Sequence, residues 1–427
     1  MRTLRQFRNF CLPCVTTIVL ACSSNAVAQT SYKVIDLGAP KNDNFSMVMS
    51  VNNQGWTEVM AGNEAPGQLD FVPAQLLNGR VLIQNADGFT LDLGTLGGPN
   101  SWDNWGEINE VGQVVGFSES AVPDPNGEDI CGFGTHLTCL PFLWQFNHMI
   151  ALPTLGGNNG EASAINDRGL IVGMAENGDV DSSCPPDTTN NRIQVPVLWE
   201  HGKVQALPTV DGDPDGFVFW INNRGQAAGY SGNCTGALHA ISWENGIATP
   251  LPDLGNHGQA WGINNQGQIV GTVGSADGQT QTGAIWQDGK LTTVLGLVPG
   301  DLGGIAFGNN SKGQVVGADF DSSFFWSHGF IYQDGVMTDL NKLFPASSNL
   351  FVTFPAKINE RGQIGGMGIV LSGPDKGDVH AFLATPVNER MEGKSVADIA
   401  PSRPESNLPA SARNRLLRFD RRGAACH

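Results

Sequence analysis

Apolar and polar residues alternate along most of this chain in short runs that end at turn residues, a pattern that predicts β-strands. The runs recur around a motif in which an apolar residue and Asn precede two variable residues and Gly. Seven copies occur, and their steps are 57, 57, 56, 42, 46 and 49 residues. The motif asparagines are Asn52, Asn109, Asn166, Asn222, Asn264, Asn310 and Asn359. A fixed motif at this period indicates a repeat architecture.

Each repeat predicts four antiparallel strands. One strand leads into the Asn motif, a second follows its Gly, and a third carries an aromatic residue such as Trp199 or Trp243. The fourth strand follows a turn such as Asn245-Gly246, which is typical of a β-hairpin. The motif Asn can bond its own turn, and the motif Gly can take the positive φ that a bulged turn requires. Four strands in 42 to 57 residues make a propeller blade.

The two ends of the repeat region complement each other. The last repeat stops after its third strand, at residues 380–386, and residues 32–38 resemble a missing fourth strand. Joining them predicts an all-β fold, a seven-bladed β-propeller over residues 31–387 that leaves no exposed sheet edge at the closure. A linear β-solenoid is the alternative.

These motifs resemble the HAF repeat of bacterial extracellular proteins, named for a His-Ala-Phe element. That element is intact at His380-Ala381-Phe382 and partial at residues 239–240 and 328–330. The accompanying Asp-Leu-Gly-Thr-Leu-Gly-Gly phrase spans residues 92–98. The resemblance implies a secreted or surface repeat protein, and it carries over no catalytic residue because the pattern is structural.

The first 28 residues predict a secretory signal. Three arginines precede an apolar stretch, and Ala26-Val27-Ala28 is a small-residue cleavage site. The alternative is a lipid anchor at Cys22, because Val19-Leu20-Ala21-Cys22 resembles a lipobox. At the other end, residues 388–427 lose the periodicity and predict a disordered basic tail.

Composition narrows the class of partner. The chain has 55 Gly, 24 Pro and only 15% charged residues, which favours strands and turns over helices. Residues 31–387 carry 13 Lys and Arg against 36 Asp and Glu, so we expect no nucleic-acid binding. The acidic surface favours solubility, with calcium or a cationic partner as alternatives. We expect a monomer.

Cysteines of an exported chain are expected to form disulfides. Cys131 and Cys139 lie eight residues apart in one loop, and Cys184 and Cys234 lie in equivalent loops of consecutive repeats. We therefore predict that the first pair closes a loop and that the second pair joins neighbouring repeats. Without a Cys-x-x-Cys pair, a zinc site is not expected.

The candidate site is the face opposite the tight turns, because binding residues concentrate in variable loops on a rigid scaffold. Two aromatic residues outside the strand register, Trp102 and Trp105, are candidates for stacking on a sugar ring. The candidate acids in the long connections are Asp124, Glu128, Glu176, Asp179 and Asp181. The alternative interpretation is that these acids are solvated loop charges.

One loop has the spacing of a calcium site. Asp211, Asp213 and Asp215 alternate before a Gly, as hard-cation loops require. However, the twelfth position is Asn222 instead of an acid, so a plain acidic turn is the alternative. No other cofactor is expected.

Catalytic motifs are sparse in this sequence. It contains no Gly-x-Ser-x-Gly elbow, no His-Glu-x-x-His helix and no Gly-Lys phosphate loop. We therefore expect a non-catalytic binding module for a glycan or a surface protein. The alternatives are a carbohydrate-active hydrolase or lyase using two carboxylates on the variable-loop face, and a structural envelope protein with a plugged ring.

Overall fold

The computed structural model describes residues 30–387, apart from residues 41, 65–75, 104, 186–187, 211, 237, 256, 276–279 and 322–325. The expected signal segment (1–28) and basic tail (388–427) lie outside the described residues. The described part is all-β, with 28 strands and one short 3₁₀ helix, η2 (Leu340–Leu343).

Five separate sheets each contain four antiparallel strands in sequence order. They are β6 (Gly97–Trp102), β7 (Val114–Pro123), β8 (Leu137–Gln145) and β9 (His148–Ala151); β10 (Gly160–Ile165), β11 (Ile171–Val180), β12 (Arg192–Glu200) and β13 (Lys203–Ala206); β14 (Asp215–Ile221), β15 (Ala227–Gly232), β16 (Leu238–Glu244) and β17 (Ile247–Pro250); β18 (Gly258–Ile263), β19 (Ile269–Gly274), β20 (Gln281–Gln287) and β21 (Lys290–Val294); and β22 (Gly303–Asn309), β23 (Val315–Phe320), β24 (Trp326–Gln333) and β25 (Val336–Asp339).

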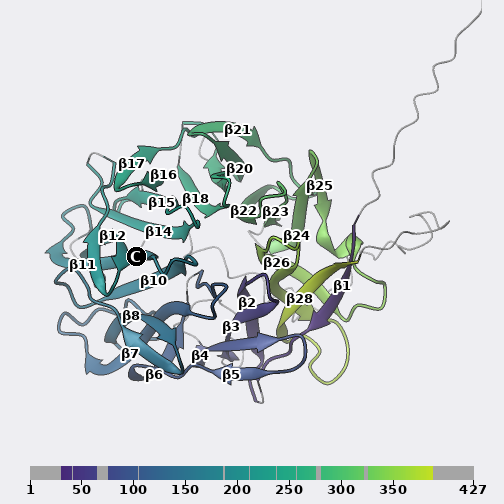
Figure 1. Ribbon diagram of the computed structural model, residues 1–427, viewed down its shortest axis with the longest axis horizontal. Coiled ribbons are helices and arrows are strands. Elements are labelled where there is room, and N and C mark those ends of the chain that lie inside the picture. The colour runs from purple at the N-terminus through teal and green to yellow at the C-terminus, as the bar shows by residue number, and fades with distance from the viewer. Residues whose placement is uncertain are drawn as a thin grey trace, which may run out of the picture.

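The remaining eight strands form one sheet with two four-stranded halves. One half is β2 (Phe45–Val51), β3 (Trp56–Glu64), β4 (Leu76–Asn85) and β5 (Thr90–Asp92), and the other is β26 (Leu350–Ile358), β27 (Ile364–Val370), β28 (Val379–Val387) and β1 (Ser31–Asp36). A single pair, Phe45 and Val379, joins the halves. The sheets stand as blades around a common axis (Figure 1), so the predicted β-propeller class is confirmed.

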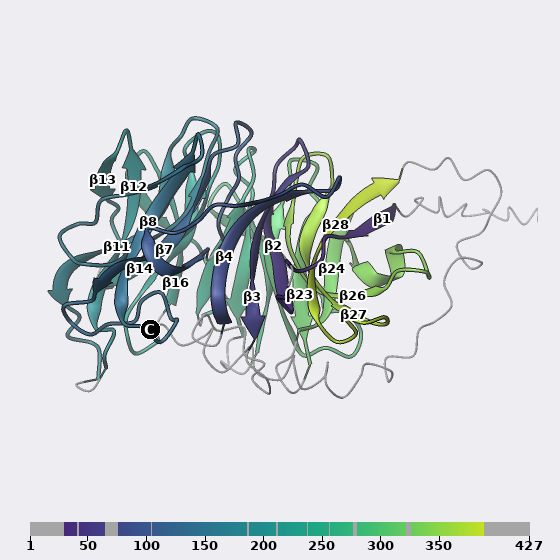
Figure 2. The ribbon, with the colours of Figure 1, turned by 90° about the horizontal axis from the view of Figure 1, so that it is seen from below.

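The N-terminal strand completes the last blade. β1 pairs antiparallel with β28, from Ser31 opposite Val387 to Asp36 opposite Phe382. Figure 2 shows the two strands side by side at one end of the molecule. The sequence prediction that residues 32–38 supply the missing fourth strand is therefore confirmed in its pairing.

The seven motif asparagines form a closed hydrogen-bonded circuit. In each, the side-chain Nδ2 donates to the backbone carbonyl of the motif Asn in the next blade, over 2.8 to 3.2 Å, and Asn359 donates to Asn52. The Oδ1 of each Asn accepts from two N–H groups of its own turn, as the sequence predicts; for Asn264 these belong to Gln266 and Gln268. All seven motif glycines have positive φ, between 75° and 86°.

Two faces follow from this arrangement. We call the end that carries the Asn motifs and the turns between third and fourth strands the tight-turn face, and the other end the variable-loop face. The blades pack through buried aromatic side chains, and the indole N–H of Trp199, Trp243 and Trp286 each donates to a Pro carbonyl. In the described part of the chain, no helix has the length and apolar character that crossing a membrane demands.

Candidate functional site

In the described part of the chain, the variable-loop face includes three irregular connections between second and third strands. In the blades β6–β9 and β10–β13 the second strands have ten residues each, against six in β15, β19 and β23. We call the described residues 121–136, 179–185, 188–191 and 233–236 the loop platform.

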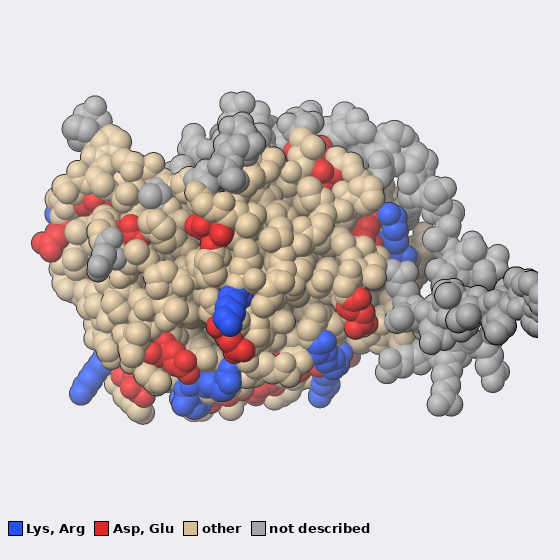
Figure 3. Space-filling view, turned by 90° about the horizontal axis from the view of Figure 1, so that it is seen from above, with Lys and Arg blue, Asp and Glu red and all other residues tan. Residues whose placement is uncertain are grey.

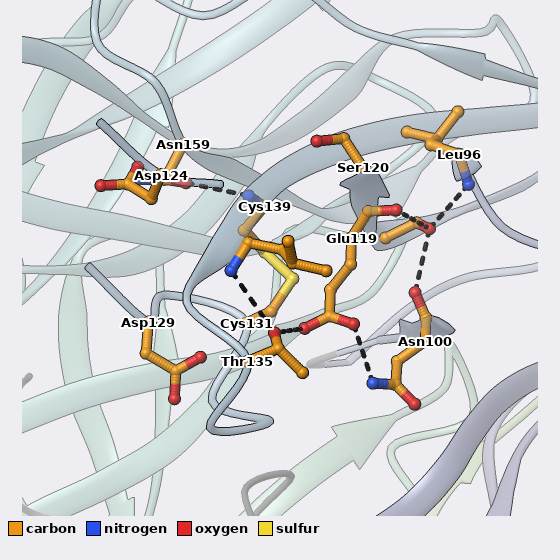
Figure 4. Close-up of a disulfide and its surroundings, with 12 residues drawn as sticks. Leu96, Asn100, Glu119, Ser120, Asp124, Asp129, Cys131, Thr135, Cys139 and Asn159 are labelled. Carbon is orange, nitrogen blue, oxygen red and sulfur yellow. Dashed lines mark hydrogen bonds between the residues drawn. A yellow bond between two sulfur atoms is a disulfide. The ribbon is translucent and has the colours of Figure 1, made fainter. Parts of the chain in front are cut away.

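A disulfide closes the first loop of the platform. Cys131 and Cys139 are bonded, with their Cα atoms 5.3 Å apart, as the sequence predicts (Figure 4). Close by, Glu119 accepts from Asn100 Nδ2 at 2.8 Å and from the hydroxyl of Thr135. Asn100 in turn accepts from the backbone N–H of Gly79 in the preceding blade. The loop is thus tied both to itself and to the sheets beneath it.

Hydrogen bonds join the first loop to the second. Glu128 Oε1 accepts from the backbone N–H groups of Asn191 and Arg192, at 3.2 and 3.3 Å. The backbone N–H of Asp129 donates to Asn190 Oδ1 at 2.9 Å, and Asn190 Nδ2 returns a bond to the Asp129 carbonyl. These contacts span more than 60 residues of sequence.

A second disulfide joins the second loop to the third. Cys184 and Cys234, from neighbouring blades, are bonded as the sequence predicts. The backbone N–H of Cys234 also donates to Ser183 Oγ, and Ser183 donates to Asp181. Asp181 and both sulfurs lie within 4.8 Å of one another, but the sulfurs are bonded to each other. Three loops from three blades therefore form one cross-linked surface.

Three of the five predicted acids do come together, but inside the platform. Asp124, Glu128 and Glu176 are buried, and Asn159 Nδ2 donates to both Asp124 and Glu176. Burial raises the pKa of Glu176 to about 7, and the Glu128 carboxylate adds to the rise. These acids fix backbone N–H groups of the loops, so their interpretation as exposed ligand-binding groups is corrected. Asp179 alone of the five is exposed, and Asp181 is buried beside the second disulfide.

The exposed side chains of the platform are mainly uncharged. They include Val122, Pro125, Asn126, Thr135, Val180, Ser182 and Thr235. The platform's acids lie mostly beneath this surface, because their oxygens serve backbone donors. A partner would therefore meet hydroxyl, amide and aliphatic groups on a rigid base.

Both tryptophans proposed for sugar stacking are used inside the protein. Trp102 is 3% exposed and contacts Phe45 and Phe133, with ring centroids 6.2 and 6.1 Å away. Trp105 reaches the axis and contacts Phe219, Trp261, Phe307 and Phe354, which come from four different blades. The sugar-stacking interpretation is therefore corrected: Trp102 is a core residue, and Trp105 packs among rings from four other blades.

The predicted calcium loop has protein partners at its two described acids, and Asp211 lies outside the described residues. Asp213 Oδ2 accepts from Ser231 Oγ and lies 2.8 Å from His239 Nδ1. Asp215 accepts from the backbone N–H of Gln194 in the preceding blade, and burial raises its pKa to about 7. The acids thus stabilise strand ends, and calcium binding here stays a prediction.

A charged axial group was missed from the sequence. Lys357 extends from β26 to Trp220 of β14, with Nζ 2.8 Å from the ring centroid. Desolvation lowers the pKa of Lys357 to about 7 and raises that of Glu107 to about 8. Two residues before their motif Asn, other inner strands have Ala164, Gly262 or Gly308. The charged residues Glu107 and Lys357 at this position, two residues before the motif Asn, were the signal available in the sequence.

A buried acid pair lies close to this axial group. Glu58 and Asp103 are both fully buried, and desolvation together with the neighbouring Asp103 carboxylate raises the pKa of Glu58 well above its ordinary value. Desolvation also raises the pKa of Asp103, to about 7. Their side chains pack against Gly106, which leaves no room there for a Cβ atom. Glu58 Oε1 and Oε2 and Asp103 Oδ2 have no hydrogen-bond donor among the described residues, so both raised pKa values follow from burial beside a second acid.

Comparisons with known proteins bear on the fold only. No protein-family model and no curated protein matches the chain. Among solved structures it is similar to the β-propeller domain of the Trilobed protease from Pyrococcus furiosus (12% identity, 70% of this chain and 81% of that chain, TM-score 0.44). It is also similar to streptogramin B lyase (8% identity, 84% and 99%, TM-score 0.46) and to the gluconolactonase XC5397 from Xanthomonas campestris (12%, 83% and 90%, TM-score 0.38). At these identities the likeness concerns architecture, which the strand topology of the chain establishes independently.

Proposed function

We propose that this chain is an exported, non-catalytic binding module whose loop platform recognises an uncharged partner, with a glycan as the first class to test. One observation carries the proposal: three non-repeating loops from three blades are cross-linked into a single rigid surface. A surface that is ordered before binding loses little conformational entropy on contact. The two disulfides fit an oxidising compartment, and the HAF motifs fit an exported repeat protein.

The alternative of a carbohydrate-active enzyme has less support than the binding module. A glycosidase needs two carboxyl groups that face a substrate across a cleft. Glu128 and Glu176 are both fully buried under the platform and bound to backbone donors. Two hollows in the described surface lie away from these acids, one beside β1 and one on the outer strands β12 and β13.

The packing at the axis supports a second candidate, a structural envelope protein. Trp105 is partly buried and packs against aromatic side chains of four other blades at the centre of the ring. In that case the platform would bind no small carbohydrate, and its cross-links would serve stability alone.

A glycan array separates these candidates. The chain without its first 28 residues is applied together with two variants that make the same change on opposite faces. Val122 on the platform is 60% exposed and Val111 on the tight-turn face is 71% exposed. We expect Val122→Glu to weaken glycan binding about tenfold, equivalent to about 1.4 kcal/mol, and Val111→Glu to leave it unchanged. If the parent chain binds no glycan on the array, or if both variants lose binding equally, the proposal is contradicted.

A further inference from the structure

We propose that Glu58 and Asp103 form a buried calcium site between the blade β2–β5 and the blade β6–β9. This inference concerns the interior of the propeller and does not depend on what the loop platform binds. It starts from two places where the repeat departs from its own pattern.

The first departure is an acid at a core position of the second strand. Glu58 lies on β3, three residues after the motif Gly55, and its side chain is fully buried. The other repeats have a small or aliphatic residue at this position, namely Val115, Val172, Ala228, Val270, Val316 and Gly365. Neither carboxylate oxygen of Glu58 has a hydrogen-bond donor among the described residues. Because an unpaired buried charge is strongly unfavourable, this position requires a neutral carboxyl group or a counter-ion.

The second departure is a longer inner strand in the neighbouring blade. Five residues lie between Trp102 and Ile108, opposite two residues of β7. At the equivalent place in the next blade, three residues lie between Glu161 and Ile165, opposite two residues of β11. Asp103 belongs to this insertion, directly after β6. Bulged insertions within strands are common beside functional sites.

The two carboxyl groups meet around Gly106. A Cβ atom at Gly106 would lie 2.5 Å from Glu58 Oε1 and 2.8 Å from Asp103 Cγ, so only glycine leaves room for both acids. Asp103 Oδ1 accepts from the backbone N–H of Gly106 at 3.1 Å, but Asp103 Oδ2 has no donor among the described residues. Carboxylate oxygens from two blades therefore lie together in the interior without a described donor.

The charge around this pair favours a divalent cation. The charged groups that act on Glu58 are Asp103 and Glu107, and the lysine that acts on Glu107 is Lys357. Three acids thus face one lysine, which leaves two negative charges unbalanced when all four groups are ionised. On the surface shown in Figure 3, by contrast, Asp and Glu side chains are in contact with solvent, and several lie beside Lys or Arg. A cation with two positive charges balances the interior group.

Calcium suits this pair better than zinc or magnesium. Ligands that are all oxygen favour a hard cation, whereas zinc favours His and Cys. Magnesium gives up its water reluctantly and usually keeps several water ligands, which disagrees with two fully buried side chains. The carboxylate oxygens without donors form part of the roughly six to eight oxygen ligands that calcium takes, so backbone carbonyls or water would complete the set.

Differential scanning calorimetry of the purified chain, with calcium or with the chelator EGTA, tests the site. The chain is first unfolded and refolded in EGTA to remove a buried ion, because metal binding at such a site is coupled to folding. Glu58→Gln keeps the shape of the side chain and removes its charge, and Glu58→Val gives the residue type of the other repeats. The matched control is Asp213→Asn, which removes a carboxylate from the other candidate calcium loop.

We expect calcium at about 100 times its Kd to raise the melting temperature of the parent chain by about 3–4 °C. Both Glu58 variants are expected to lose this rise, whereas Asp213→Asn is expected to keep it. In EGTA, Glu58→Gln is expected to melt no lower than the parent, because it removes a buried charge that has no partner. Elemental analysis after dialysis is the companion measurement, with less bound calcium expected in either Glu58 variant than in the control.

A parent chain that melts at the same temperature in calcium and in EGTA would overturn the inference and leave protonation as the means of neutralising the two acids. Loss of the calcium effect in Asp213→Asn but not in Glu58→Gln would assign the ion to the acidic loop, and it would likewise overturn the inference. If Glu58→Gln does not fold, Asp103→Asn takes its place with the same expected loss.

Discussion

The asparagine circuit is open to a single-atom test at Asn264. The side chain of Asn264 has two separate roles: Oδ1 holds its own turn, and Nδ2 donates to the carbonyl of Asn310 in the next blade at 2.9 Å. Asn264→Asp keeps the acceptor and replaces the donor with oxygen. The substitution therefore breaks the link between blades and places a carboxylate oxygen against the Asn310 carbonyl, so the loss estimated from the missing donor alone is a lower bound. Asn264→Ala removes both roles without adding a charge.

The magnitude follows from the contacts. Asp at this buried position leaves the Asn310 carbonyl without its donor, which costs about 1–3 kcal/mol. Asn264→Ala additionally leaves two turn N–H groups without an acceptor, for a total of about 3–5 kcal/mol. Unfolding entropy scales with chain length, so 1 kcal/mol corresponds to only about 1–1.5 °C in a domain of this size. We therefore expect melting temperatures lower by about 2–4 °C for Asn264→Asp and about 4–6 °C for Asn264→Ala.

Differential scanning calorimetry at pH 7 measures these shifts, with Asn245→Asp as the control. Asn245 lies in an exposed turn where the equivalent residues of other blades are Asp288 and Asp334, so its substitution is expected to change nothing. If Asn264→Asp melts with the parent, or shifts no more than Asn245→Asp, the circuit does not stabilise the ring and the reasoning is wrong.

Three further predictions follow from the site. Replacing Cys184 and Cys234 together by Ser is expected to lower stability by about 2–4 kcal/mol and to reduce the effect of reductant on melting; alkylation of these thiols in the untreated chain would show that the bridge is absent. The pKa of Glu107 is about 8 in the fold against 4.5 ordinarily, so the folded chain retains a proton that the unfolded chain releases, and stability falls as pH rises between those values. Glu107→Gln is expected to shrink the melting-temperature difference between pH 5 and pH 8, and an unchanged difference would rule out this source. Millimolar calcium is expected to raise the melting temperature if Asp211, Asp213 and Asp215 bind it; an unchanged melting curve would leave the plain acidic turn, in which Asp213 accepts from Ser231 and contacts His239.

Features that depend on local sequence were predictable. The motif Asn bonds the N–H groups two and four residues ahead, and the motif Gly takes positive φ, so both follow from the turn itself. The missing fourth strand was also predictable, because each complete repeat defines what the incomplete one lacks. Likewise, the disulfide between Cys184 and Cys234 follows from equivalent positions in consecutive repeats.

Features that depend on several blades at once were not predictable. Trp105 is enclosed by side chains more than 100 residues away in sequence, and nothing near it in the chain indicates that it enters the axis. The sequence around Glu128 and Glu176 does not differ from that around an exposed loop acid. Only the approach of neighbouring loops buries these two side chains. The same applies to the platform as a whole, since its cross-links join residues about 50 to 66 positions apart.

The pairing of β1 with β28 sets the order in which this molecule can be completed. A chain made from residue 1 onward holds its first strand unpaired until the last strand, ending at Val387, has been synthesised. The intermediate blades can form early, but the two ends of the arc meet only when the whole repeat region is available. Truncation before β28 should therefore leave an open arc with an exposed strand edge, whereas loss of residues after Val387 leaves the closure intact.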